Sequence, residues 1–281
     1  MNRIFKFRFG SENDIEALTS DFIWFADIES LNDPYEGYAR FNSEGVSDTL
    51  REQFLASVYS MEPDQSVAPH EEVAQKKVAL GPKFAEHIDS KAIESAKSYY
   101  KNHRDDYKVL SVSLQKDSHD FPAPLNNMLM WSHYANGFKG FCIEFDVERL
   151  VSTIVDRNAV QIGTSKIKYA TDGKLPTVNL KTFMEAQISG GLDSSFEILT
   201  SFTKKEQSWS YENELRLISE MRGKHYYGSE CVKAVYIAEK MPLEKRQTLL
   251  SIIANKPNQI DVFEVRLHPE EYKFGFFRID T

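Results

Sequence analysis

Short segments in which apolar and polar residues alternate strictly are the feature that most constrains how this chain folds. In Arg3–Phe9 the three phenylalanines occupy one face, and Ile4, Lys6 and Arg8 occupy the other. Tyr107–Leu114 alternates in the same way. A period of two is typical of a β-strand with two different faces. The chain therefore contains strands that are far apart in sequence and have to meet in a sheet.

Helical patterns separate these strands. Residues from about 46 to 105 are predicted to be helical, with a break at Met61–Pro69, where two prolines stand. Further strands are predicted at Phe22–Ala26, Gly140–Asp146, 160–169, Ser208–Ser219, Val232–Ala238, Ile260–Leu267 and Tyr272–Ile279, and further helices at Ser11–Leu18, Asn126–Gly137, 177–205 and Leu243–Ala254. No repeat or linker is visible, so we predict one α+β domain, residues 1–281, with a helical insertion at about 46–105.

Composition excludes several classes of protein. The 281 residues are 41% hydrophobic and 27% charged, which is ordinary for a globular chain. Cys142 and Cys231 lie in apolar, strand-like runs, which favours buried thiols over a disulfide or a metal site. No stretch approaches the roughly 20 apolar residues of a membrane helix, and we expect a cytoplasmic protein with no membrane partner. A net charge of −8 argues against a dedicated duplex-DNA binder.

Three segments carry a family resemblance: SLNDPYEGY (Ser30–Tyr38), MWSHYANGFKGFCIEFD (Met130–Asp146) and WSYENELRLI (Trp209–Ile218). In order and content they resemble a bacterial domain-of-unknown-function family, number 2971. Leu215 departs from the bulky aromatic residue expected between Glu214 and Arg216. This resemblance implies no assigned activity, but it suggests a place in phage-defence or mobile-element loci, as a toxin-type effector with an antitoxin or another defence protein as partner.

A second resemblance rests on Arg8 in the first strand, Ser111 and Ser113 in a middle strand, and Glu212 and Glu214 in a late strand. This order is similar to the Arg, Ser-x-Ser, Glu-x-Glu pattern of ADP-ribosyltransferases. It implies a split, mixed or antiparallel sheet whose cleft holds NAD as substrate. The reaction implied is cleavage at the nicotinamide bond and transfer of ADP-ribose to a macromolecule, protein or nucleic acid, or to water.

The resemblance implies a role for each group. Arg8, with Lys6 beside it, would hold the diphosphate, because a guanidinium offers a planar fork of donors. Ser111 and Ser113 would orient the nicotinamide ribose. Glu214 would stabilise the cationic transition state, and Glu212 would orient or deprotonate the incoming nucleophile.

Two further segments supply candidate NAD-binding residues. His133 and Tyr134 end a short predicted helix, where the ring of Tyr134 would stack on a base and His133 would bind phosphate or move a proton. Asn32 and Asp33 follow a buried strand, and Asp33 either joins the site or caps a turn. The neighbouring Trp131 is expected in the core.

Three alternatives stay open. Cross-strand ion pairs on a solvated sheet face would equally account for the charged residues Lys6, Arg8, Glu212, Glu214 and Arg216. A metal-dependent nuclease or hydrolase would use Asp33, Glu36, His133, Glu212 and Glu214 as ligands, although no metal-binding spacing supports it. A non-catalytic module would bind a nucleotide or a protein in the same cleft without turnover.

Overall fold

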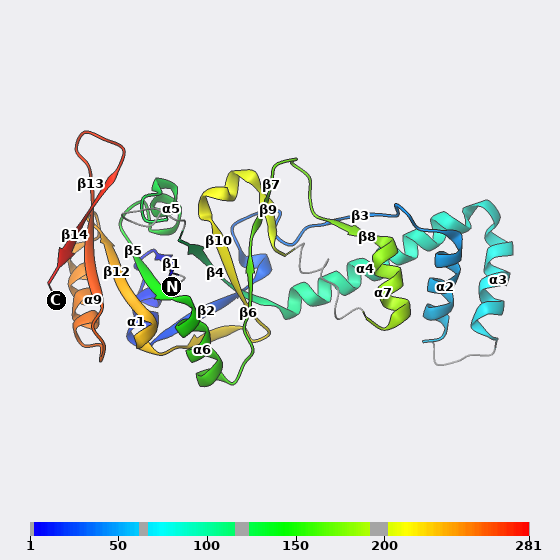
Figure 1. Cartoon of the computed structure of the whole chain (residues 1–281), viewed down its shortest axis with the longest axis horizontal. Coiled ribbons are helices and arrows are strands. Elements are labelled where there is room, and N and C mark those ends of the chain that lie inside the picture. Colours follow the sequence, from blue (N-terminus) through cyan, green and yellow to red (C-terminus); the bar gives the residue numbers. More distant parts are fainter. Residues whose placement is uncertain (1–2, 62–66, 116–123, 192–201, 281) are drawn as a thin grey trace. The chain divides into compact units, whose positions relative to one another are not determined.

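The computed structural model describes residues 3–61, 67–115, 124–191 and 202–280. The chain divides into two compact units (Figure 1). Unit 1 comprises Met1–Leu31, Tyr107–Tyr169 and Lys205–Thr281, and unit 2 comprises Asn32–Asp106 and Ala170–Lys204. The described residues contain no helix long and apolar enough to cross a membrane.

Unit 1 is built on one large mixed sheet, mostly antiparallel, with neighbours in the order β11, β2, β4, β1, β5, β12, β13, β14. Its strands are β1 (Arg3–Arg8), β2 (Phe22–Asp27), β4 (Lys108–Leu114), β5 (Phe141–Asp146), β6 (Gly163–Lys166), β10 (Glu214–Ser219), β11 (Gly223–Tyr226), β12 (Val232–Ala238), β13 (Asp261–Leu267) and β14 (Phe274–Ile279). Its helices are α1 (Glu12–Thr19), α5 (Met128–Tyr134), α6 (Val147–Asn158) and α9 (Leu243–Ala254), with short 3-10 turns η1 (Ile28–Ser30), η4 (Gln207–Glu212) and η5 (Ser229–Cys231). The α+β fold class is confirmed.

The sheet branches at β4. Along one edge every residue of β4 except Leu114 pairs with β10, from Ser113 opposite Glu214 to Lys108 opposite Ser219. Two strands share the other edge: β1 pairs only at Leu114 and Ser113, and β2 pairs only at Val109 and Lys108. Past Phe5, β1 leaves β4 and continues beside β5 alone. The sheet is therefore split between β1 and β4, over the middle of β4.

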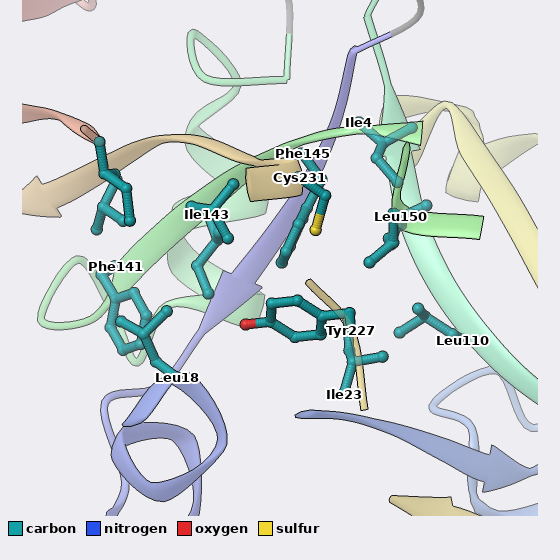
Figure 2. Packing of buried hydrophobic residues seen from close by; sticks show 14 of the residues in the cluster. Ile4, Leu18, Ile23, Leu110, Phe141, Ile143, Phe145, Leu150, Tyr227 and Cys231 are labelled. Atoms are coloured by element: carbon teal, nitrogen blue, oxygen red, sulfur yellow. The ribbon is translucent and has the colours of Figure 1, made fainter. Parts of the chain in front are cut away.

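Both faces of the sheet are covered. One face carries the larger core, in which α1, α6 and α9 pack on strand residues such as Ile4, Phe141 and Leu217. Figure 2 shows part of this cluster, with the ring of Tyr227 among the labelled side chains. The other face carries Phe5 and Phe7, against which α5 packs its buried Trp131. Cys142 and Cys231 are buried free thiols, as predicted.

Unit 2 is mainly helical. It contains α2 (Asp48–Tyr59), α3 (Pro69–Leu80), the turn η2 (Gly81–Lys83), α4 (Phe84–Asp106), α7 (Leu180–Ser189) and a two-stranded ladder of β3 (Arg40–Asn42) with β8 (Thr177–Asn179). Its core joins α2, α4 and α7 through Phe54, Ile88 and Met184. The short strands β7 (Lys168–Ala170) and β9 (Lys204–Glu206) lie where the chain passes from one unit to the other.

Several predicted elements need correction. The predicted helical stretch of about 46–105 contains α2, α3 and α4, and the compact unit that holds these helices also includes 32–47 and 170–204. The predicted helix 177–205 is helical only from Leu180 to Ser189 in its described part, and residues 192–201 lie outside the described residues. The predicted strand Ser208–Ser219 is a 3-10 turn up to Glu212 and a strand only from Glu214. Helix α6 was not predicted.

Candidate functional site

Lys6 occupies the split between β1 and β4. Its side chain is half-buried, and its Nζ donates a 2.7 Å hydrogen bond to the backbone oxygen of Ser111 on β4. Burial and the nearby charge of Arg8 lower the pKa of Lys6 to about 7, although Glu214 and Glu212 act in the opposite direction. Lys6 is therefore a cation that titrates near neutral pH, at the branch of the sheet.

A buried cluster of charges lies where η4 meets β10. The Nζ of Lys205 is 2.8 Å from Oε2 of Glu212 and 2.7 Å from Oε2 of Glu214. The Nε of Arg216, a residue with 0% exposure, donates a 2.8 Å hydrogen bond to Oε1 of Glu214. The amide of Glu214 also donates to the hydroxyl of Tyr169 at 2.8 Å. These pairs satisfy charges that would otherwise be costly to bury.

The pKa values of the two glutamates in this cluster are shifted in opposite directions. Burial alone raises the pKa of Glu214, but Arg216 and Lys205 outweigh burial and bring it down to about 2. For Glu212 burial is the largest effect, and it raises the pKa even though Lys205 opposes it. Glu214 is thus an anion at neutral pH, and Glu212 is the carboxyl group more easily protonated.

A chain of hydrogen bonds leads from Glu212 to the surface. The hydroxyl of Tyr134 donates to Oε1 of Glu212 and is also hydrogen-bonded to Tyr211. The hydroxyl of Tyr211 lies 2.9 Å from Nδ1 of the exposed His133. Tyr134 and His133, both predicted site residues, therefore connect the buried Glu212 to solvent through polar groups.

Ser113 joins this region, and Arg8 does not. Ser113 is buried opposite Glu214 in the β4–β10 ladder, and it is also opposite Phe5 in the β1–β4 ladder. Phe5, Ser113 and Glu214 therefore share a face. Because Arg8 is three residues beyond Phe5 on a regular strand, it starts on the opposite face, beside Phe141 of the larger core. The prediction that Arg8 and the glutamates face the same way is wrong.

Other predicted residues lie elsewhere. Ser111 is half-buried and contributes its backbone oxygen to Lys6 rather than its hydroxyl. Asn32 and Asp33 belong to unit 2, where Asp33 is buried and its Oδ1 accepts a 2.9 Å hydrogen bond from the amide of Tyr35. This is the turn-capping role. Trp131 is in the core, as expected.

The ligand set proposed for a metal site is not assembled in the described part of the chain, which contains no group of three or more His, Cys, Asp or Glu side chains able to hold a metal ion. The alternative of cross-strand ion pairs on a solvated face does not hold for Glu214. The pairs of Glu214 are buried, and one of them joins it to Arg216 on its own strand.

One segment of the chain is similar to a known family, and it contains most of the cluster. Residues 130–217 match the model of DUF2971, a protein family of unknown function. Less than half of the chain is matched. No match was found among curated proteins or among solved structures. The DUF2971 match contains Tyr134, Lys205, Glu212, Glu214 and Arg216, whereas Lys6, Arg8 and the two serines lie outside it.

Sequence reasoning missed two members of the cluster. Lys205 is the last residue of a segment predicted as helix, and nothing in its local pattern marks it as the residue that bridges two glutamates. Tyr169 ends a predicted strand and looks like an ordinary aromatic strand residue. The aromatic residues of WSYENE were available as a signal, because Tyr211 stands next to Glu212, but their link to His133 is tertiary.

Proposed function

We propose that unit 1 is an ADP-ribosyltransferase-like enzyme that cleaves NAD at its nicotinamide bond, with Glu212 and Glu214 as the catalytic carboxylates. The observation that carries the proposal is the buried pair itself: two glutamates bridged by Lys205, one with a pKa near 2 and the other with a raised pKa. Two carboxyl groups whose environments separate their pKa values suit two different roles in one reaction.

The roles follow from the charges. Glu214, which stays ionised, stabilises the positive charge that develops on the ribose as nicotinamide leaves with the electrons of the broken C–N bond. Glu212 accepts the proton of the incoming nucleophile, whose oxygen or nitrogen forms the new bond to the ribose carbon. That proton has a route to solvent through Tyr134, Tyr211 and His133.

The strand pairing agrees with part of the residue set that the ADP-ribosyltransferase resemblance implies. Ser113 stands opposite Glu214, and Lys6 supplies a cation in the split, next to β4. Arg8 does not fit. Lys6 starts on the same face as Arg8, but its side chain lies in the split, where the charges of Glu214 and Glu212 act on it. Lys6 therefore takes the place of Arg8 as the residue proposed to meet the diphosphate. Glu214 is only 2% exposed, and substrate binding therefore has to displace Lys205 or widen the split.

The test is release of nicotinamide from NAD by purified protein, measured by chromatography with and without added cell protein or nucleic acid. Glu212→Gln and Glu214→Gln keep the shape of each side chain and remove its charge, and the exposed Glu220→Gln is the matched control. We expect release by the wild type and by Glu220→Gln, and at least a 100-fold loss in the other two variants, about the size of one well-placed electrostatic group.

Dependence of the release on protein or nucleic acid would identify the class of acceptor, and release without either would indicate water. Equal rates in wild type and Glu214→Gln would contradict the proposal, as would the absence of release under every condition.

A further inference from the structure

A pocket of about 770 Å³ opens in unit 1 at the end of β1 where Arg8 lies. Its wall is formed by the end of β1, by α1, by β2 and β11, and by Lys245 of α9. Neither Glu212 nor Glu214 lines it. A cavity of this volume is within the range of small-molecule sites, which is roughly 300–1,000 Å³. We call it the Arg8 pocket.

Three cations line the Arg8 pocket. Arg8 is mostly buried, and its guanidinium is 3.5 Å from Asp14. Lys224 is 41% exposed, and its Nζ is 2.7 Å from Oε1 of the exposed Glu16. The Nζ of Lys245 donates a 2.7 Å hydrogen bond to the backbone oxygen of Gly10. With Asp14 and Glu16 included, the wall retains one net positive charge.

An anionic ligand in the Arg8 pocket can replace a carboxylate as the partner of a lysine. An exposed ion pair such as Lys224 with Glu16 contributes little to stability, so a phosphate replaces Glu16 at small cost. Arg8 is different, because its backbone is paired with β5, its guanidinium lies beside Asp14, and its planar donors match two oxygens of one phosphate. The pocket therefore presents one preorganised phosphate ligand and two adaptable ones.

Large aromatic rings stand beside these cations. Phe9 is 50% exposed and Trp24 is 47% exposed, and both line the Arg8 pocket together with the buried Phe22. Lys224 lies 4.4 Å from the centre of the Phe22 ring. Exposed aromatic rings next to phosphate-binding cations are an arrangement on which nucleobases stack. A simple anion such as sulfate would make no use of Phe9 and Trp24.

We propose that the Arg8 pocket is a second ligand site, which binds a free nucleotide. Arg8, Lys224 and Lys245 hold the phosphates, and Trp24 and Phe9 stack on the base. The site goes beyond the proposed NAD-cleaving function, because Arg8 and Glu214 start on opposite faces of the sheet. Occupancy of this pocket is independent of the two catalytic glutamates.

The experiment is a calorimetric titration of the full-length protein with ATP, AMP, NAD, adenosine and inorganic tripolyphosphate, repeated with intrinsic fluorescence. Of the three tryptophans, Trp131 is buried and Trp209 is half-buried, so a nucleotide in this pocket quenches mainly Trp24. We expect ATP to bind at least 10-fold more tightly than either adenosine or tripolyphosphate. Trp24→Leu removes the fluorescence change and weakens ATP binding at least 5-fold.

Variants of the cations separate this site from its alternatives. Arg8→Gln and the exposed Lys224→Gln each weaken ATP binding at least 10-fold without affecting adenosine, and Arg266→Gln on β13 is the matched surface control. Because Lys224 is exposed, Lys224→Gln remains informative even if Arg8→Gln does not fold. Glu214→Gln binds ATP like the wild type, so failure of NAD cleavage leaves this proposal standing.

Two results would overturn the proposal. Tripolyphosphate binding as tightly as ATP, with no effect of Trp24→Leu, would reduce the pocket to an anion site. If no nucleotide at millimolar concentration produces heat or fluorescence quenching, the pocket does not bind a nucleotide.

Discussion

The Nζ of Lys6 lies 2.7 Å from the backbone oxygen of Ser111, across the split where β1 leaves β4. In a continuous sheet, backbone hydrogen bonds between the two strands would occupy this place. Here it holds a titratable cation instead. The pKa of Lys6 falls from 10.5 to about 7 on folding. At pH values between these two numbers, the unfolded chain therefore binds more protons than the folded protein.

The first prediction concerns Lys6 and pH. Stability contributed by Lys6 has to rise as pH increases from about 7 towards 10.5, because protonated Lys6 is disfavoured in the folded state. In urea unfolding at pH 7, 8 and 9, the wild type gains stability relative to Lys6→Met at each step. A constant difference between the two proteins would show that Lys6 titrates normally.

The second prediction concerns the bridging lysine. Lys205→Met leaves Glu212 and Glu214 buried and close together without their shared cation, so we expect a loss of about 3–5 kcal/mol in the free energy of unfolding at pH 7. At pH 5 the loss is smaller, because Glu212, with its raised pKa, is protonated more readily. The neighbouring Lys204→Met is the control, and equal losses in both variants would refute the bridging role.

The third prediction concerns acid. The pKa of Glu214 is about 2 in the folded protein and 4.5 as an ordinary glutamate, so its stabilising effect is complete above pH 4.5 and disappears as pH falls towards 2. Guanidinium unfolding between pH 5 and pH 2.5 is expected to show a steeper fall in stability for wild type than for Glu214→Gln. Parallel curves would mean that Glu214 is not held by Arg216 and Lys205.

The fourth prediction concerns the start of β5. A Cβ at Gly140 would lie 2.0 Å from the backbone oxygen of Arg8, so Gly140→Ala has to push β1 and β5 apart. We expect the free energy of unfolding to fall by at least about 3 kcal/mol. Gly137→Ala, where a Cβ meets no atom within 4 Å but φ is +61°, is expected to lose about 1–2 kcal/mol from backbone strain alone. Thermal unfolding of both variants compares the two causes.

Local patterns predicted much of the fold. Ser11 and Asp14 form the capping box of α1, and the alternation of Leu110 and Val112 matches their burial on one face of β4. Helix α9 has the predicted bounds. These elements are readable because capping and side-chain alternation depend on residues only a few positions apart. The 3-10 turn before Glu214 is predicted as a strand, because its polar and aromatic residues alternate like those of a strand.

The sequence by itself determined the α+β class, the free buried thiols, and the presence of a charged strand that contains Glu214 and Arg216. Only the tertiary structure decided which of these charges meet. Pairing of Phe5 with Ser113 and of Ser113 with Glu214 turns Arg8 away from the glutamates, and a shift of one residue would reverse that result. Register depends on contacts between strands more than 100 residues apart, such as Phe5 and Ser113, which no local pattern records.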